Sequence, residues 1–398
     1  MLIEDLDSVK RKVDLKQLIT PDIKQLVIAF DKHGYDLRIV GGAVRDLVLG
    51  KQPKDVDFAT DATPDEMKTI FDAEGIKWIA TGEKHGTLTA LGPSTREPFE
   101  ITTLRIDTEQ DGRHANVSFT RSWEDDAKRR DLTYNAMSID LKNGNLHDYF
   151  HGLDDLEAGR TQFVGDATAR MQEDFLRILR LFRFSARYNH PIDSETRKAI
   201  KQNASNLKNI SGERIWMEVS KILAGPNADV ALKTMNETGV SAEIGLPIRD
   251  LKTLNDVKTR TSNPITLLST QLIDGNEVDA IRARWKLANP ERDLAVFLVE
   301  NKYAKLDNEK LQNMIVNGAK KEFVSELSKL VGLKFDANKW NAPLFPVTGN
   351  DLISAGFKPG PELGKTLNIL KQKWIESRYS LTKIDLLGYL NRLQNKTN

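Results

Sequence analysis

Two aspartates and a Gly-Gly turn lie close together near the N-terminus, and their residue types suit phosphate chemistry. Gly41 and Gly42 are followed by Arg45, and Asp55 and Asp57 stand two residues apart in the segment DVDF. Side chains two apart on a strand point to the same side, so both carboxylates can face whatever lies over the glycine turn. Paired carboxylates form a hard oxygen site for Mg²⁺, and glycines let backbone N–H groups approach a phosphate. The spacing predicts a metal-dependent centre for a nucleoside triphosphate.

Either half of this pattern alone has a simpler explanation. A Gly pair or two nearby aspartates, taken separately, indicates a tight β–α turn or a pair of solvated loop carboxylates. Here both occur together, with Arg45 and Asp46 between them. Arginine can donate two hydrogen bonds to a phosphate, and two Mg²⁺ ions about 3.5 to 4 Å apart can neutralise a triphosphate and orient an attacking hydroxyl. The combination therefore favours transfer of a nucleotidyl unit.

A strand–helix–strand unit must bring these residues together, and the surrounding sequence predicts one. Short β-like runs alternate with helical ones, beginning with a strand over 37–40, a helix over 43–50 and a strand over 56–60. The tetrapeptide TPDE predicts a capped helix over 64–74. Further strands are expected in TLTAL and FEITTLRI, and a hairpin joins SIDL to LHDY across an Asn-Gly turn. The first part of the chain is therefore predicted to be α/β with a small mixed sheet.

After residue 154 the apolar residues follow helical periodicity to the end of the chain. MQEDFLRILRLFRFSARY reads as one helix, and SGERIWMEVSKIL as another, with Trp216 and Met217 in the core and Glu213 and Arg214 as structural supports. The predicted class is α+β, with a mixed-sheet head followed by all-α neck, body and tail domains. Breaks rich in Gly, Pro and Asn give the predicted boundaries as 1–150 for the head, 151–225 for the neck, 226–340 for the body and 341–398 for the tail.

Composition excludes several classes of protein. The 398 residues are 39% hydrophobic and 29% charged with a formal net charge of +1, so a nucleic-acid partner must be held by local basic patches. Cysteine is absent, which excludes disulfides, zinc–thiolate sites and cysteine nucleophiles. No signal peptide, transit peptide or membrane span is indicated. We expect a soluble cytoplasmic protein without a membrane or DNA partner, and a mitochondrial or nuclear pool as well if the source is eukaryotic.

The segments GGAVRD (41–46) and DVDF (55–58) resemble the first motif of nucleotidyltransferases with a polymerase-β-like head. Within that superfamily they are similar to the tRNA nucleotidyltransferases that add CCA to tRNA 3′ ends. The order of the motifs fits the bacterial and eukaryotic class of these enzymes, and the sequences of FEITTLRID and DGRHA are most similar to the eukaryotic type. The resemblance implies that Asp55 and Asp57 bind the catalytic metal and that Gly41, Gly42 and Arg45 contact the triphosphate.

Two segments downstream carry weaker signals. The resemblance implies that Glu100, on a predicted strand, assists the metal site, although a single Glu on a strand is more often a surface residue. Residues 107–119 lack apolar periodicity and contain an Asp-Gly turn, so they predict a mobile loop or an ordinary hairpin connection. A similar loop in CCA-adding enzymes switches specificity from C to A. The likeness implies that Asp111, Gly112 and Arg113 take part.

The segment RRDLTYNA (129–136) resembles the family's second signature. Adjacent arginines followed by an acid and an amide supply donors for phosphate oxygens and ribose hydroxyls, although a solvated charged helix is the alternative. The resemblance implies that Arg130 contacts the phosphates and that Asp131 and Asn135 contact the sugar. Tyr134 stands where the family usually has an aliphatic residue, which puts only local packing in doubt.

The segment QEDFLRILRLFR carries the argument for base selection. On one helix Asp174 and Arg177 would be i, i+3 neighbours and share a face. Cytosine and adenine each present an amino donor beside a ring-nitrogen acceptor, which a carboxylate and a guanidinium match. Uracil and guanine present a carbonyl to the carboxylate and leave a buried polar group unpaired. Alone, the pair would be a surface ion pair worth about 0.3 to 0.5 kcal/mol, but the resemblance to the family's EDxxR motif favours base reading.

Neighbouring charged residues on the same segment have two interpretations. Glu173, Arg180 and Arg183 can orient the base-reading pair, and Arg180 is a candidate nucleotide contact. The alternative is that Arg180, Arg183 and Arg187 form a solvated stripe.

The C-terminal segment 345–367 carries the last candidate residues. Its GKT sequence lacks the upstream glycine of a P-loop, where Pro359 stands instead, so an ATPase is excluded. Pro361 can open a helix whose N-terminus, with Lys358 and Lys365, could bind RNA phosphates. The stretch looks like the tail of CCA-adding enzymes, which contacts the tRNA elbow, although a plain helical hairpin fits these residues nearly as well.

The resemblance therefore implies an enzyme that transfers CMP, CMP and AMP from CTP and ATP to a tRNA 3′ end and releases pyrophosphate, with Mg²⁺ as cofactor. A poly(A) polymerase or a CC-adding enzyme of the same superfamily is the alternative. A non-catalytic tRNA-binding or chaperone protein of the same fold is the alternative from another class, and the intact Asp55 and Asp57 pair argues against it.

Overall fold

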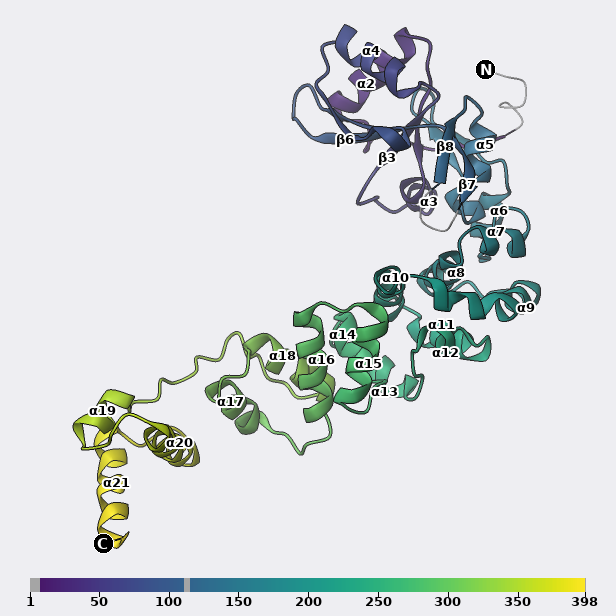
Figure 1. Ribbon diagram of the computed structural model, residues 1–398. Helices are drawn as coiled ribbons and strands as arrows, with labels where there is room; N and C mark the ends of the chain where they lie inside the picture. Colours follow the sequence, from purple (N-terminus) through teal and green to yellow (C-terminus); the bar gives the residue numbers. More distant parts are fainter. Residues whose placement is uncertain (1–7, 111–114, 398) are drawn as a thin grey trace. The chain divides into compact units, whose positions relative to one another are not determined.

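The computed structural model describes residues 8–110 and 115–397 (Figure 1). Internal contacts divide the chain into two units, and each is described by itself. The first unit comprises Met1–Asn255 with Asp279–Ala288, and the second comprises Asp256–Val278 with Asn289–Asn398. The finer division into head, neck, body and tail stays a prediction, although the names remain useful for the segments concerned.

The head is built on an eight-stranded mixed sheet with the strand order β1-β10-β9-β2-β3-β6-β5-β4. Neighbouring strands are antiparallel except β3 and β6, which are parallel, so residues that begin these two strands lie at the same edge. The predicted mixed sheet and α+β class are confirmed. The strands are β1 Val9–Lys12, β2 Leu37–Val40, β3 Asp57–Thr60, β4 Trp78–Gly82, β5 Thr87–Leu91, β6 Pro98–Thr103, β9 Ser138–Asp140 and β10 Asn145–His147.

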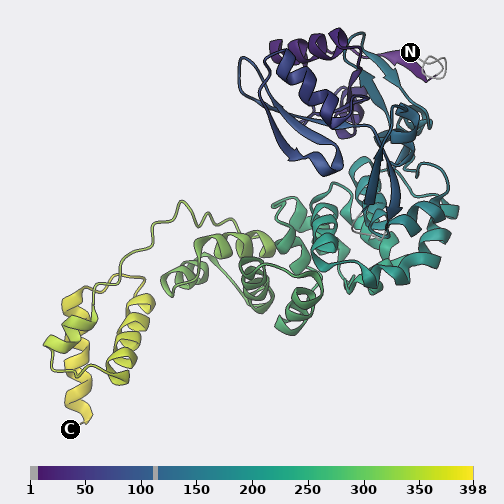
Figure 2. The ribbon, with the colours of Figure 1, turned by 45° about the horizontal axis from the view of Figure 1, so that its top comes forward.

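Helices cover both faces of this sheet. Helices α2 (Pro21–Lys32) and α4 (Pro64–Ala73) pack side by side on one face, where the rings of Phe30 and Phe71 meet edge to face at 5.9 Å (Figure 2). The predicted capping box at the start of α4 is present. On the other face, Trp123 of α5 (Trp123–Lys128) packs with apolar residues of β2 and β3. Both faces of the sheet are therefore packed against helices, which fixes the strands that carry Asp57 and Glu100 and the strand that ends before Gly41.

The segment predicted as a mobile loop over 107–119 is mostly a hairpin. Strands β7 (Arg105–Gln110) and β8 (Ala115–Phe119) pair antiparallel as a separate two-stranded sheet. The expected loop was too long because Ile106, Thr108, Val117 and Phe119 alternate with polar residues, a strand period that cross-strand pairing stabilises. The predicted loop residues Asp111, Gly112 and Arg113 lie outside the described residues.

The rest of the described chain is helical, which confirms the predicted change of pattern. The expected single helix over 171–188 is wrong, because α7 ends at Glu173 and α8 begins at Leu176. Asp174 between them is extended, and its Oδ1 accepts a hydrogen bond from the N–H of Leu176 at 3.1 Å. A carboxylate that bonds nearby backbone competes with helix continuation, which explains the break.

The core prediction for Met217 is also wrong, since it is 45% exposed. Helix α10 buries Ile215, Val219 and Ile222, and Met217 lies off that stripe. Trp216 is half-buried and stacks on Trp285 with ring centroids 5.8 Å apart.

The remaining helices belong partly to the head and partly to the segments that follow it. They are α3 Gly42–Val48, α5 Trp123–Lys128 and η2 Thr133–Asn135 in the head, then α6 Gly152–Glu157, α7 Ala167–Glu173, α8 Leu176–Tyr188, α9 Ser194–Asn203, η3 Ala204–Asn209, α10 Gly212–Ala224, α11 Ala228–Glu237, α12 Val240–Ile244, α13 Leu251–Lys258, α14 Pro264–Ser269, α15 Gly275–Trp285, α16 Asn289–Asn301, α17 Asn308–Val316, α18 Lys321–Val331, α19 Gly349–Ser354, α20 Pro361–Glu376 and α21 Lys383–Thr397.

The tail segment has an apolar core of its own. Leu352 of α19, Leu370 and Trp374 of α20 and Leu386 of α21 are buried against one another. Helix α20 begins at Pro361, as predicted. No helix in the described part of the chain is long and apolar enough to cross a membrane.

Candidate active site

The glycine turn after β2 lies next to both an acidic side chain, Asp57, and a basic one, Arg130. Gly41 has φ +70°, a left-handed conformation that disfavours other residues. A Cβ atom placed on Gly41 would lie 3.5 Å from Nη1 of Arg130 and 4.0 Å from Oδ2 of Asp57. The turn therefore brings together Gly41, Asp57 and Arg130, three residues that the sequence predicted for one site.

Strand pairing places the aspartates beside this turn. β2 and β3 pair antiparallel with Val40 opposite Asp57, the first residue of β3. Asp55 precedes the strand, so the expected placement of both aspartates on one strand holds only for Asp57. Both side chains are exposed, and within the described part of the chain neither carboxylate takes part in a hydrogen bond or ion pair. They are available to a ligand.

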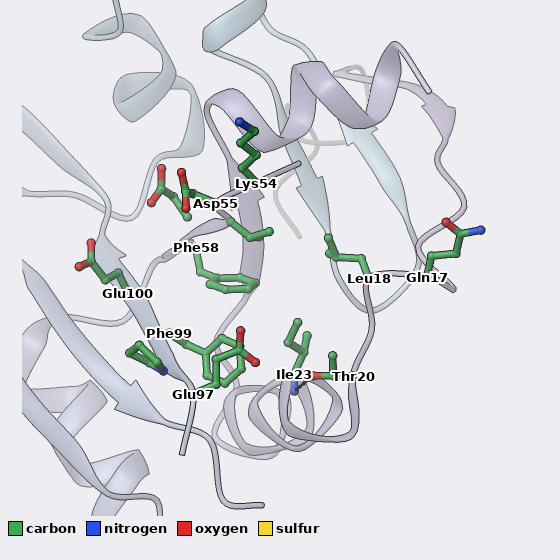
Figure 3. Close-up of a pocket in the computed structure, with 13 residues that line it drawn as sticks. Gln17, Leu18, Thr20, Ile23, Lys54, Asp55, Phe58, Glu97, Phe99 and Glu100 are labelled. Atoms are coloured by element: carbon green, nitrogen blue, oxygen red, sulfur yellow. Dashed lines mark hydrogen bonds between the residues drawn. The ribbon is translucent and has the colours of Figure 1, made fainter. Parts of the chain in front are cut away.

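An open pocket of about 740 Å³ adjoins the aspartates. Glu100 of β6 lines it together with Asp55 and Asp57, and Figure 3 shows the Asp55 and Glu100 carboxylates beside the rings of Phe58 and Phe99. Among the described residues, no group of three or more His, Asp or Glu side chains forms a ready-made metal site. A protein site with two carboxylates still suits Mg²⁺, which usually completes its shell with substrate phosphates and water. The assisting role of Glu100 stays a prediction.

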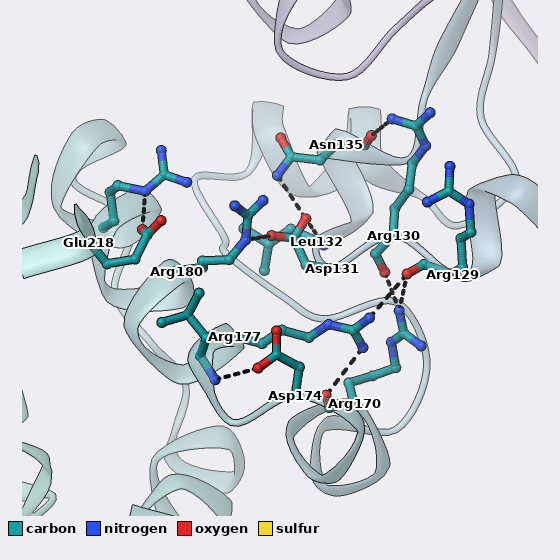
Figure 4. Close-up of polar contacts among 12 residues, drawn as sticks. Arg129, Arg130, Asp131, Leu132, Asn135, Arg170, Asp174, Arg177, Arg180 and Glu218 are labelled. Carbon is teal, nitrogen blue, oxygen red and sulfur yellow. Dashed lines mark hydrogen bonds and ion pairs between the residues drawn. The ribbon is translucent and has the colours of Figure 1, made fainter. Parts of the chain in front are cut away.

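Residues predicted to contact phosphate and ribose form hydrogen bonds with one another. Arg45 is 3% exposed, and its Nη1 donates to Oδ1 of Asn135 at 2.6 Å. Asn135 Nδ2 donates to Oδ1 of Asp131 at 3.1 Å, and Nε of Arg180 donates to Oδ2 of Asp131 at 2.6 Å. These hydrogen bonds link α3, η2 and α8, and Figure 4 shows the part from Asn135 through Asp131 to Arg180. They position these elements firmly, and the direct nucleotide contacts of the residues involved stay predictions.

The aromatic rings of α8 complete the surroundings of Arg45. Its guanidinium carbon lies 5.1 Å from the ring centroids of both Phe184 and Tyr188. Tyr134, the residue that departs from the family pattern, is fully buried and meets the same two rings edge to face. Burial raises the pKa of Asp131, but the charge of Arg180 and the hydrogen bonds from Arg180, Asn135 and the backbone N–H of Leu132 together hold that pKa below its usual value. Asp131 therefore stays ionised beside its partners.

The predicted base-reading pair does not share one helix face, because Asp174 lies in the break itself and Arg177 lies in the first turn of α8. Oδ2 of Asp174 accepts from Nη2 of Arg214 at 2.5 Å. Arg177 pairs with Glu173 and donates to the carbonyl of Arg129 at 3.3 Å. Glu173 therefore pairs with Arg177 and Arg214 pairs with Asp174, and the orienting role of Glu173 in base reading stays a prediction. The backbone N–H of Arg177 donates to the carbonyl of Asp174 at 3.0 Å, so the two residues stay one turn apart although their side chains bind different partners (Figure 4).

The alternative of a solvated stripe along α8 does not fit Arg180 and Arg183, which are partly buried and paired with acids, but Arg187 is 46% exposed and does fit it. Each of the four α8 arginines faces an acid from another element or from the preceding helix. Glu218 is 0% exposed and accepts from Nε of Arg183 at 2.5 Å. The four ion pairs are Arg177 with Glu173, Arg180 with Asp131, Arg183 with Glu218, and Arg187 with Asp46.

Two buried charged residues escaped the sequence analysis. Nη2 of Arg170 donates to the carbonyls of Arg129 and Arg130, both at 2.6 Å. Asp126 of α5 is buried between the side chains of the same two arginines. Its spacing of three and four residues before them was the available signal, because these are helical neighbours. Arg170 had a similar signal, because Glu173, with which it pairs, stands three residues after it.

The tail lysines are exposed where they were expected. Lys358 precedes helix α20 and Lys365 lies in its second turn, and both side chains are solvent-accessible. Their contact with RNA stays a prediction.

Comparison with known proteins identifies relatives over nearly the whole chain. A model described as the poly A polymerase head domain matches residues 37–162, and one described as a probable RNA- and SrmB-binding site of polymerase A matches residues 191–246. The mouse protein named mitochondrial CCA tRNA nucleotidyltransferase 1 is 40% identical over 95% of this chain and 92% of its own length.

Two solved structures have the same fold. The CCA-adding enzyme of Bacillus stearothermophilus in complex with CTP superimposes with a TM-score of 0.74 at 28% identity, covering 96% of this chain and all of that one. The Thermotoga maritima CCA-adding enzyme complexed with tRNA has a TM-score of 0.69 at 21% identity, covering 97% of this chain and 99% of that one, and supports the fold alone.

Proposed function

We propose, because this chain belongs to the family of CCA-adding tRNA nucleotidyltransferases, that it adds C, C and A in turn to tRNA 3′ ends without a nucleic-acid template. CTP and ATP are the nucleotide substrates, and tRNA is the acceptor. The acceptor 3′-hydroxyl attacks the α-phosphorus, the new ester bond forms, and pyrophosphate leaves. The convergence of Gly41, Asp57 and Arg130 over one turn is the observation that best supports this reaction at this place.

A divalent metal requirement follows from the nucleotidyltransferase family, and we infer that Mg²⁺ meets it. Asp55 and Asp57 would hold the ion, since both are exposed and have no protein partner in the described chain. The bound ion would neutralise charge on the triphosphate. Gly41 lets the phosphates approach the backbone without a clash, and Arg130 supplies positive charge beside them.

Base selection is assigned to Asp174 and Arg177. A carboxylate acceptor next to a guanidinium donor matches the pairing edges of cytosine and adenine and mismatches those of uracil and guanine. Arg214 and Glu173 support the assignment, because each fixes one member of the pair. Lys358 and Lys365 are proposed to bind tRNA phosphates as exposed point charges.

A poly(A) polymerase is the rival activity, because the head matches a model named for that enzyme. The relatives that resemble this chain over nearly its full length are CCA-adding enzymes, which favours CCA addition. The mouse relative is named as mitochondrial. For this chain we propose a cytoplasmic location, with a mitochondrial or nuclear pool in a eukaryotic source, and cell fractionation tests it.

Sequencing the product made on a tRNA that lacks CCA, with all four nucleoside triphosphates present, tests the proposed activity. We expect CCA and then termination. Long runs of A would establish a poly(A) polymerase, termination after CC would establish a CC-adding enzyme, and absence of any incorporation would leave a non-catalytic tRNA-binding protein.

A further inference from the structure

Asp126 is a buried carboxylate that the proposed chemistry has not yet used. It lies on α5, is 3% exposed and carries contacts on both oxygens. Oδ1 accepts from Nε of Arg129 at 2.9 Å and from the backbone N–H of Arg105 at 3.2 Å. Oδ2 accepts from Nε and Nη2 of Arg130 at 3.3 and 3.1 Å. Burial opposes its ionisation, but the charges of Arg130 and Arg129 prevail and lower its pKa.

The contact with Asp126 fixes which edge of Arg130 faces the glycine turn. A guanidinium is planar, so holding Nε and Nη2 also determines the direction of Nη1. Nη1 has one long contact, 3.5 Å from the carbonyl oxygen of Asn135, and lies 3.5 Å from the position of a Cβ on Gly41. The unheld edge of Arg130 therefore points over the turn that approaches the triphosphate in the proposed function.

Charge balance favours an anion at this edge. One carboxylate stands between two guanidiniums, so the group of Asp126, Arg129 and Arg130 carries a net positive charge. Both arginine side chains remain 18% exposed, whereas Asp126 is closed off from solvent. The buried acid orients the cations without cancelling them.

We propose that Asp126 is a positioning residue for the nucleoside triphosphate, acting through Arg130. It holds the guanidinium so that Nη1 faces the Gly41 turn, where it binds phosphate oxygens common to CTP and ATP. The inference rests on the proposed function for the identity of the ligand. Asp126 itself touches neither the nucleotide nor the reacting atoms.

A purely structural role makes a different prediction. Asp126 also anchors Arg105, the first residue of the β7–β8 hairpin, so its loss could act by loosening that hairpin. A loosened hairpin would lower the stability of the protein, or would affect the addition of A more than that of C, because the resemblance links this hairpin's loop to the switch from C to A. A misdirected Arg130 would weaken CTP and ATP equally, because the triphosphate is the same in both.

Asp126→Asn tests the proposal, with Asp125→Asn on the same helix as the matched control. Asp125 undergoes the same chemical change, and its side chain forms an ion pair with neither arginine in the described chain. For Asp126→Asn we expect the Kd of CTP and of ATP, measured by calorimetry with Mg²⁺, to rise about tenfold each, or about 1.4 kcal/mol. The KM for tRNA should stay within about twofold. Asp126→Glu should restore part of the affinity.

Unchanged nucleotide affinity would overturn the proposal, as would a defect confined to ATP. Direct binding of CTP does not depend on which nucleotides are added, so this result is separable from failure of the CCA-adding assay.

A double-mutant cycle with Arg130→Gln isolates the route of action. If Asp126 acts through Arg130, Asp126→Asn should have no further effect on CTP affinity in the Arg130→Gln background. Additive losses would overturn the proposal. If Asp126→Asn does not fold, Arg130→Lys provides the alternative test, because it leaves Asp126 in place. It keeps the charge but lacks the planar fork, so CTP affinity should fall nearly as far as in Arg130→Gln, and wild-type affinity would refute the orienting role.

Discussion

The surroundings of α8 and the tail segment use positive charge in opposite ways. Along α8, Arg177, Arg180 and Arg183 are largely enclosed, and each meets a carboxylate. In the tail, the interior is apolar and the proposed RNA-binding residues Lys358 and Lys365 stand in solvent. A site that discriminates between small bases requires charges that cannot move, whereas a surface for a phosphate backbone requires charges that can adjust.

This contrast also predicts where substitutions should affect stability. Removing one partner of a buried ion pair leaves an uncompensated charge, whereas removing one partner of an exposed pair costs little. The exposed aspartates proposed to bind the metal, Asp55 and Asp57, form a third group, whose loss should affect the reaction alone. The following experiments separate the three.

The largest effect on activity is expected at the exposed aspartates. Asp55→Ala with Asp57→Ala should reduce nucleotide incorporation by about a thousandfold or more, because metal stabilisation contributes several kcal/mol to such transfers. Thermal stability should not change, since neither carboxylate has a partner in the described chain. Incorporation of labelled CMP into tRNA that lacks CCA measures the effect. Glu97→Ala, an acid lining the same pocket, is the control, and equal loss in both would contradict a specific metal site.

The largest effect on stability is expected along α8. Arg183→Met leaves Glu218 buried without its partner and should lower the free energy of unfolding by about 3 to 5 kcal/mol. The matched tail variant is Lys373→Met, which breaks an exposed pair with Glu376 and should cost about 0 to 1 kcal/mol. Urea denaturation followed by circular dichroism compares the two. Similar losses would erase the proposed difference between the regions.

The next-largest effect is expected on the selection of the incoming base. Asp174→Ala or Arg177→Ala should relax selection while polymerisation continues, because one bidentate contact provides about 1 to 3 kcal/mol of discrimination. Single-nucleotide incorporation from UTP and GTP measures the change. Gln172→Ala, an exposed neighbour, should select normally. If both variants still incorporated only C and A, the proposal that Asp174 and Arg177 together select the base would be refuted.

A smaller and salt-dependent effect is expected in the tail. Lys358→Ala with Lys365→Ala should weaken tRNA binding and lower the slope of log K against log salt by about 0.7 to 0.9 for each phosphate that the variant no longer neutralises. Binding measured across a salt series detects it. Base choice and CTP affinity should not change. Lys24→Ala, an exposed lysine of α2, provides the comparison, and an equal change in slope would mean that the tail lysines are not special.

The smallest effect is a dependence of tail stability on pH. Asp351 caps α19 and pairs with Lys383, and these contacts lower its pKa to about 2, the Lys383 hydrogen bond contributing most. A lowered folded pKa means that the contribution is complete above the unfolded value of 3.8 and disappears as pH falls through about 2. Acid titration of the tail's unfolding should show a loss that Asp351→Asn removes. An unchanged acid profile in that variant would contradict the assignment.

Local features of the sequence predicted much of this arrangement. The capping box before α4, the Asn-Gly hairpin and the Gly41 turn depend on neighbouring residues, and all three are present. The partners of Arg180 and Arg183 were not predictable, because Asp131 and Glu218 reach them only through tertiary packing. The break at Asp174 was missed because the apolar periodicity continues across it.

The enclosure of Arg45 has a consequence for how the protein is made. Its aromatic neighbours Phe184 and Tyr188 and the Arg187 that pairs with Asp46 all belong to α8, beyond the end of the head sheet. N-terminal segments emerge from the ribosome first and begin to fold there. The glycine turn must therefore wait for α8 to emerge before it is fully supported, so a fragment ending near residue 150 would be a poor donor for domain-swap chimaeras.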